Sequence, residues 1–272
     1  HRQFVMLFSL IANALLIWRF RLPALLFVLI YEPAKFYLFG DRFLAEGIIV
    51  YPLAYLTGIV LLKILNKKLF SIDYLLSAIS AWFVIFMREP YVPLALILYA
   101  LILFDKKINR TQILSLGLFI LLSIVTLLSF DLREYFFNVI TVNYTAVLPS
   151  DIKTEMFGNR FLQAFFYPFY IFFYGKWNIL RQILVMVDIV FLANVFVLIK
   201  NKSYRMIIAI FIILGLANIR VVLPGSMFYE AFHMLVWYAL FIFISSLLVF
   251  SNIKQKTLFY GSILIVSVAL LS

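Results

Sequence analysis

The sequence predicts an all-α fold, a polytopic bundle of transmembrane helices, from its composition, its long apolar runs and the charges of its loops. Hydrophobic residues make up 66% of the chain and charged residues 13%, whereas soluble domains carry about 25% charged residues. Several apolar runs approach or reach the roughly 20 residues that cross a hydrocarbon core as a helix. The clearest are 48–62, 113–130, 183–199 and 232–250. They do not alternate polar and apolar positions as barrel strands do, so we expect helices.

Breaks at charges, prolines and glycines divide the chain into about ten hydrophobic segments, several of them shorter than a full span. The segments are 3–18, 22–31, 44–65, 71–87, 91–104, 112–130, 161–174, 182–199, 205–222 and 232–250, with a last one from 258 to the end. Neither an internal repeat nor a flexible linker separates them, so we expect a single transmembrane domain over 1–272. The chain starts at His1 rather than at a methionine, and we expect it to be a fragment of a longer protein.

The connecting loops sort by charge. Five clusters are basic with hardly an acid among them: Arg19 and Arg21; Lys63, Lys67 and Lys68; Lys106, Lys107 and Arg110; Lys200, Lys202 and Arg205; and Lys254 and Lys256. The loops between them hold nearly all the acids. Because lysine and arginine of short loops stay in the cytoplasm, the basic loops are predicted to be cytoplasmic and the others to face outward.

The charge alternation holds only if segment 161–174 does not cross the membrane. Its many phenylalanine and tyrosine residues resemble the aromatic belt found at headgroup depth. We therefore predict that this segment is re-entrant or lies along the interface.

The net charge of +11 is explained by the cytoplasmic loops, so the expected partner is a lipid bilayer and no nucleic acid. The chain contains no cysteine, which excludes a disulfide, a zinc–thiolate site and a cysteine nucleophile. We expect an integral protein of a prokaryotic plasma (inner) membrane.

The first outward loop, 31–46, concentrates three carboxylates, Glu32, Asp41 and Glu46, and two cations, Lys35 and Arg42. Glu46 stands at the start of a hydrophobic segment. Ionisable groups at such depth are candidates for a functional site because they are costly unless they are paired or wet. The alternative is an Arg42–Glu46 pair, one helical turn apart, that neutralises the start of a helix.

A second outward turn, Arg88-Glu89-Pro90, separates two short hydrophobic segments. The planar guanidinium of Arg88 offers a fork of donors that suits the phosphate of a lipid headgroup. The alternative is an interfacial arginine that pairs with Glu89.

The outward loop 218–233 is the densest polar stretch of the C-terminal half, with Arg220, Tyr229, Glu230 and His233. His233 can donate to a phosphate or carry a proton, or it can be an ordinary packing residue. Asp188 lies within a predicted span, where it could bind a proton or an ion, or contact a neighbouring helix.

Three stretches, 40–46, 86–93 and 220–224, resemble motifs of the GT-C superfamily of polyprenyl-phosphate-sugar glycosyltransferases. This superfamily includes protein mannosyltransferases and aminoarabinose transferases. The resemblance implies transfer of a sugar from a polyprenyl-phosphate donor to an acceptor on the non-cytoplasmic face. In the family the principal acids lie on the first external loop, a place that here would fall before His1.

The same resemblance gives roles to the candidate residues, with a divalent metal ion as a candidate cofactor. The implied catalytic acids are Glu32, Asp41 and Glu46 if the chain is complete, whereas in a fragment the principal base lies before His1 and these three support it. The implied lipid-phosphate ligands are Lys35, Arg42, Arg88, Arg220 and His233, and Glu89, Tyr229 and Glu230 would support them. The alternation of the loops puts these groups at one membrane face, so we predict that they gather around one outward cavity.

Two other function classes fit the sequence. A lipid flippase or secondary transporter would bind ions or protons at Glu46, Asp188 and His233. Transporters commonly show inverted repeats, and this sequence shows none. A non-enzymatic subunit of a membrane assembly is the third class.

Overall fold

The structure is a computed structural model, and it describes residues 2–37, 45–104, 109–131, 133–134, 137, 179–218 and 230–251. All regular secondary structure in these residues is helical, which confirms the predicted all-α class for this part of the chain. Three of the described helices are long and apolar enough to cross a membrane, α1 (Arg2–Phe20), α3 (Ala45–Ile64) and α6 (Arg110–Ser129). The expectation of about ten membrane segments is therefore confirmed only as far as these three.

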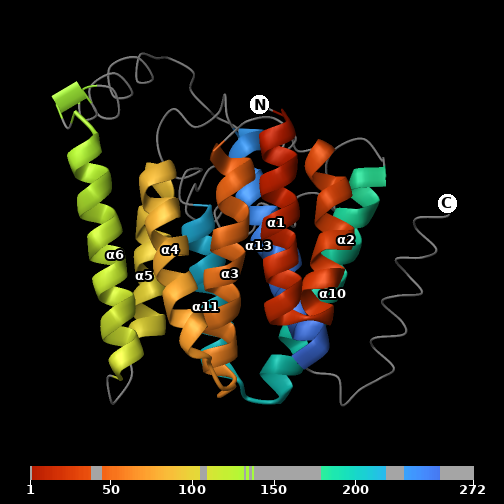
Figure 1. Cartoon of the computed structure of the whole chain (residues 1–272). Coiled ribbons are helices and arrows are strands. Elements are labelled where there is room, and N and C mark those ends of the chain that lie inside the picture. Colours follow the sequence, from red (N-terminus) through yellow and green to blue (C-terminus); the bar gives the residue numbers. More distant parts are fainter. Residues whose placement is uncertain are drawn as a thin grey trace.

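The remaining helices run alongside them in one bundle (Figure 1). They are α2 (Leu22–Tyr37), α4 (Ser71–Met87), the short 3-10 helix η1 (Glu89–Tyr91), α5 (Val92–Leu103), α10 (Ile179–Lys200), α11 (Tyr204–Ala217) and α13 (Glu230–Ser251). Most bounds agree with the hydrophobic segments within a few residues.

Helix α2 corrects one predicted boundary. The sequence analysis ended this segment at residue 31 because charges and a proline follow, but the helix continues to Tyr37 with Pro33 inside it. Glu32 and Lys35 are thus helical residues, and they pair with each other within the bundle. Segments 161–174 and 258–272 lie outside the described residues. The helices flanking the former, α6 and α10, end and begin at the same end of the bundle (Figure 1).

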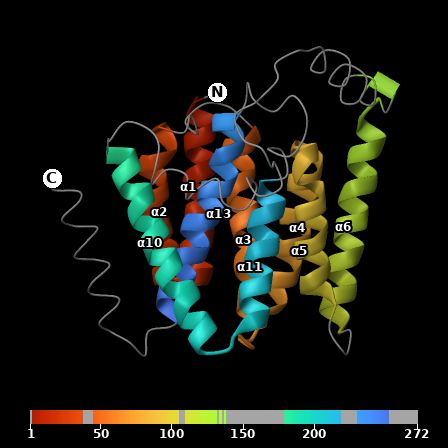
Figure 2. The ribbon, with the colours of Figure 1, turned by 180° about the vertical axis from the view of Figure 1, so that it is seen from behind.

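Helices α3 and α13 form the centre of the bundle (Figures 1 and 2). All side chains from Leu235 to Leu248 of α13 are buried, and nearly all from Ile48 to Leu61 of α3 are buried as well. A helix that is apolar around its whole circumference belongs in such a position. Helix α13 packs against α2, α3, α10 and α11, whereas α3 also packs against α1, α4 and α5.

Gly58 permits the closest approach in this centre. A Cβ atom there would lie 2.5 Å from the ring of Phe20 and 3.0 Å from the ring of Phe243. These two rings meet edge to face at 5.4 Å, and Phe20 also contacts Tyr55 at 5.7 Å. A side chain at position 58 would displace this aromatic contact between α1, α3 and α13.

The two ends of the bundle differ in charge. The turns between α1 and α2, α3 and α4, and α10 and α11 lie at one end, together with the end of α5 and the start of α6 (Figure 1). We call it the basic end because it carries Arg21, Lys63, Lys67, Lys68, Arg110, Lys200, Lys202 and Arg205. The turn between α4 and α5 and the start of α13 lie at the opposite end. The predicted grouping of the basic clusters agrees with this arrangement for their described members, whereas Lys106, Lys107, Lys254 and Lys256 lie outside the described residues. The side of the membrane that the basic end faces stays a prediction.

Three turns at the basic end contain a residue with left-handed backbone, Arg21 (φ 60°), Asn66 (φ 55°) and Lys202 (φ 55°). After α10, the amide of Ser203 donates to Leu198 O and that of Lys202 to Ile199 O, both at 2.9 Å. This is the Schellman pattern that ends a helix with a left-handed residue. Asn66 and Lys67 end α3 in the same way.

Candidate functional site

The polar cluster between α1, α2 and α3 consists of Ser9, Asn13, Glu32, Lys35 and Tyr51. Asn13 Nδ2 donates to Glu32 Oε1 at 2.6 Å, and the Tyr51 hydroxyl donates to the same oxygen at 2.8 Å. Lys35 forms an ion pair with Glu32 Oε2 and donates to the hydroxyls of Ser9 at 3.3 Å and Tyr51 at 3.1 Å. Three helices are thereby joined through one carboxylate and one ammonium group.

All the hydrogen-bond donors of Lys35 have partners within this cluster. Its buried ammonium group has three partners, as many as it has protons. A buried charge is tolerated only with such full pairing. The proposed roles of Glu32 as an acid and Lys35 as a phosphate ligand stay predictions, and in this structure both residues connect helices. Ser9 and Asn13 were missed, although two polar residues one turn apart in an apolar segment are a usable signal.

A second group, which we call the end site, lies opposite the basic end and consists of Glu46, Arg88 and Glu89. Arg88 Nε donates to Glu46 Oε1 at 2.7 Å, and Arg88 Nη1 lies 4.0 Å from Glu89 Oε2. The pair joins the first turn of α3 to the residue that ends α4. The Glu46 side chain is buried, whereas the Arg88 side chain is 29% exposed.

The backbone fixes Arg88 between two helical elements. Its conformation is extended (φ −156°, ψ 108°), and its amide donates to Val84 O at 3.0 Å, which completes α4. The short helix η1 and then α5 follow at once, each with a proline in its first turn, where the missing amide proton costs no hydrogen bond. Such a tight turn leaves Arg88 little freedom of position.

The geometry ranks the two partners of Arg88. Glu46 makes the short, charge-assisted bond, and Glu89 only reaches the distance limit of an ion pair. One of the five N–H donors of the guanidinium, Nε, is therefore committed to Glu46. The partly exposed guanidinium is preorganised by a carboxylate that is itself withdrawn from solvent.

Several predicted site residues lie where no contact can be described. Asp41, Arg42, Arg220 and Tyr229 are outside the described residues. Glu230 and His233 belong to the first turn of α13, which begins at the same end of the bundle as the end site (Figure 2). Of the predicted gathering, the structure thus brings together Arg88, Glu46 and Glu89. Within the described ranges, no group of three or more histidine, aspartate or glutamate side chains could hold a metal ion.

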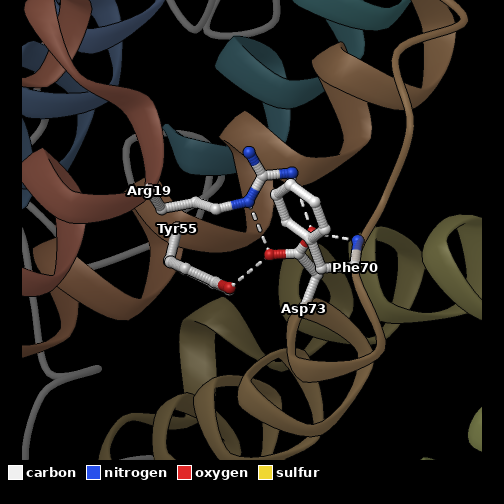
Figure 3. Close-up of polar contacts among 4 residues, drawn as sticks. All are labelled: Arg19, Tyr55, Phe70 and Asp73. Carbon is white, nitrogen blue, oxygen red and sulfur yellow. Dashed lines mark hydrogen bonds and ion pairs between the residues drawn. The ribbon is translucent and has the colours of Figure 1, made fainter.

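A buried ion pair at the basic end was not expected (Figure 3). Asp73 of α4, fully buried, accepts from Arg19 Nε at 2.6 Å and Arg19 Nη2 at 2.8 Å. It also accepts from the Tyr55 hydroxyl at 3.0 Å and from the Phe70 amide at 2.7 Å. The sequence predicts Arg19 to be a loop cation, and no role was predicted for Asp73. The sequence contains a signal for this contact, because an acid at the third position of a helix can accept a hydrogen bond from the backbone amide of the residue that precedes the helix.

Comparison with known proteins gives no relative: no family model, no curated protein and no solved structure matches this chain.

Proposed function

We propose that this chain is a membrane-embedded protein of the glycosyl-transfer type that binds a polyprenyl-phosphate-linked sugar at the end site. The observation that carries the proposal is the Arg88–Glu46 pair, which holds a partly exposed guanidinium at the end of the bundle opposite the basic residues. The proposed donor lipid would bring a phosphate to this position, on the non-cytoplasmic face.

Arg88 is suited to phosphate by its shape and by its support. A guanidinium can donate two parallel bonds to phosphate oxygens, which an ammonium group cannot. Each bond that involves a charged group contributes about 1.5–3 kcal/mol, and more where water is scarce. Glu46 fixes the orientation of the fork before the ligand arrives, so little side-chain entropy is lost on binding.

The proposal assigns different tasks to the three predicted acids. Glu46 is a positioning residue, because its carboxylate accepts from Arg88. Glu32 accepts from Asn13 and Tyr51 and pairs with Lys35, so it contributes to helix packing. The role of general base, if this chain supplies one, then falls to Asp41.

Binding of a polyprenyl phosphate to the purified chain in lipid nanodiscs tests the proposal. We expect Arg88→Ala to weaken binding about tenfold or more, since 1.4 kcal/mol corresponds to a factor of ten. Arg88→Lys should restore part of the affinity, because lysine keeps the charge without the fork. Glu46→Gln should weaken binding less than Arg88→Ala.

The matched control is Arg205→Ala, which removes an exposed arginine at the basic end. It should leave the affinity unchanged. Equal loss in Arg88→Ala and Arg205→Ala would reduce the interaction to general attraction of an anionic lipid. Unchanged binding in Arg88→Ala would refute the end site as the place of binding.

A further inference from the structure

Asp188 is a buried carboxyl group without a hydrogen-bond partner among the described residues. It is the tenth of the 22 residues of α10, so about 15 Å of helix separates it from either end. Its side chain is 0% exposed, and neither carboxylate oxygen has a hydrogen-bond partner among the described residues. Asp73 is equally buried but accepts four hydrogen bonds. Two aspartates at 0% exposure thus have opposite environments.

The neighbouring helix presents one polar group at the same level. Phe191, one turn after Asp188, contacts Phe241 of α13 at 4.5 Å. Trp237, one turn before Phe241, stacks on it at 4.6 Å. Helices α10 and α13 run in the same direction (Figures 1 and 2), so Asp188 and Trp237 lie at one level on facing sides. The buried indole N–H of Trp237 also has no acceptor among the described residues.

No described cation faces Asp188. The acidic and basic residues of α13 are Glu230 and His233, both in its first turn. No charged residue lies between Leu235 and Ser251. Helix α11 contributes Arg205 and Tyr204, both in its first turn at the basic end. The third neighbour, α2, contributes Tyr31, whose buried hydroxyl is also unpartnered in the described part, and Glu32 and Lys35, which pair with each other.

An ionised carboxylate in this place would lack any compensating charge among the described side chains. Burial of an unpaired charge costs far more free energy than burial of a neutral polar group. A buried carboxylate avoids this cost when it binds a proton and becomes neutral. A metal cation is a poorer fit because hard cations take six or more oxygen ligands, whereas Phe191, Trp237 and Phe241 surround the level of Asp188.

We propose that Asp188 is a proton-binding site in the middle of the bundle. The proton occupies one oxygen of the carboxyl group, and neither oxygen has a hydrogen-bond donor among the described residues. Release of the proton leaves a charge between α10 and α13, which weakens their contact. This inference does not depend on the lipid-phosphate proposal, because the end site contains none of these residues.

Infrared spectroscopy of the full chain in lipid provides the direct test. At neutral pH we expect the carbonyl stretch of a protonated carboxylic acid. The band should be absent in Asp188→Asn and retained in Asp73→Asn, where the lost carboxylate was already ionised and paired with Arg19. Trp237→Phe should keep the band, because the indole N–H makes no hydrogen bond to the carboxyl group in this structure.

Thermal unfolding gives a second readout. Asp188→Asn, which has the shape of the neutral acid, should keep the Tm of the wild type at neutral pH, whereas Asp73→Asn should lower it by roughly 10 °C. As pH rises, the wild type should lose stability, because the folded chain holds a proton that the unfolded chain has released. Asp188→Asn should lack that part of the loss. The proposal is overturned if the band is absent, or if Asp188→Asn lowers Tm as strongly as Asp73→Asn.

Discussion

Gly58 and Gly117 show two uses of the same residue type in apolar helices. In α3, Gly58 lets the rings of Phe20 and Phe243 approach the backbone, whereas a Cβ at Gly117 of α6 would meet nothing within 4 Å. The first glycine is required by packing and the second is not.

The pair leads to a prediction on core packing. Gly58→Ala should lower the free energy of unfolding by about 1–3 kcal/mol, the usual cost of an extra methyl group in a full core. Gly117→Ala should raise it by up to about 1 kcal/mol, the advantage of alanine over glycine inside a helix where the methyl group meets nothing. Chemical unfolding in detergent micelles measures both variants, and equal effects would contradict the described packing of α1, α3 and α13.

The left-handed turn after α10 leads to a second prediction. A side chain at φ 55° is strained, and glycine is not. Lys202→Gly should therefore raise the free energy of unfolding by up to about 1 kcal/mol. Lys200→Gly removes the same charge from the last turn of α10 and should not stabilise, since it offers no relief of strain. If the free energy of unfolding shifts in the same direction in both variants, the effect comes from loss of the charge and not from relief of backbone strain.

At the scale of single elements, the ion pair of Arg19 with Asp73 fastens α1 to α4 (Figure 3). Loss of one partner of a buried pair costs about 3–5 kcal/mol, because the other charge is left unpaired. We expect this loss for Asp73→Asn. The double variant Arg19→Met with Asp73→Asn should recover a large part of it. A double-mutant cycle measures the coupling, and additive losses would show that the two side chains act independently.

The helices themselves were largely predictable from the sequence. Lys67 and Lys68 separate α3 from α4, and Arg88 and Pro90 follow α4, so these bounds follow from the hydrophobic runs. The predicted end of α2 at residue 31 is too early, because the charges that follow lie within the helix and not after it. The pairing of Lys35 with Glu32 is local to α2, but the bond from Lys35 to Tyr51 depends on α3, a contact that no local pattern records.

The candidate site was less predictable for the same reason. Arg88 and Glu46 were each singled out, but their pairing across 42 positions depends on how α3 packs against α4. Asp188 was noted within a span, yet its lack of a partner is visible only when α10 and α13 are side by side.

At the scale of the whole molecule, the charge difference between the two ends predicts the orientation in the membrane. The chain contains no cysteine, so single cysteines can be introduced without a background. Lys67→Cys and Ser203→Cys, at the basic end, should resist a membrane-impermeant thiol reagent in intact cells. Asp131→Cys, just after α6 at the opposite end, should react. Labelling of position 67 or 203 from outside would reverse the orientation and move the end site to the cytoplasm.

The single residue between α1 and α2 constrains how the protein is made. Arg21 alone connects the two helices, and its carbonyl already accepts from Leu25 of α2. With one residue between them, α1 and α2 form an antiparallel hairpin (Figure 1). Asn13 of α1 donates to Glu32, and Ser9 of α1 accepts from Lys35, so α1 alone supplies a partner for each of these two charges of α2. Insertion of the hairpin as one unit would bring both charges into a bilayer already paired.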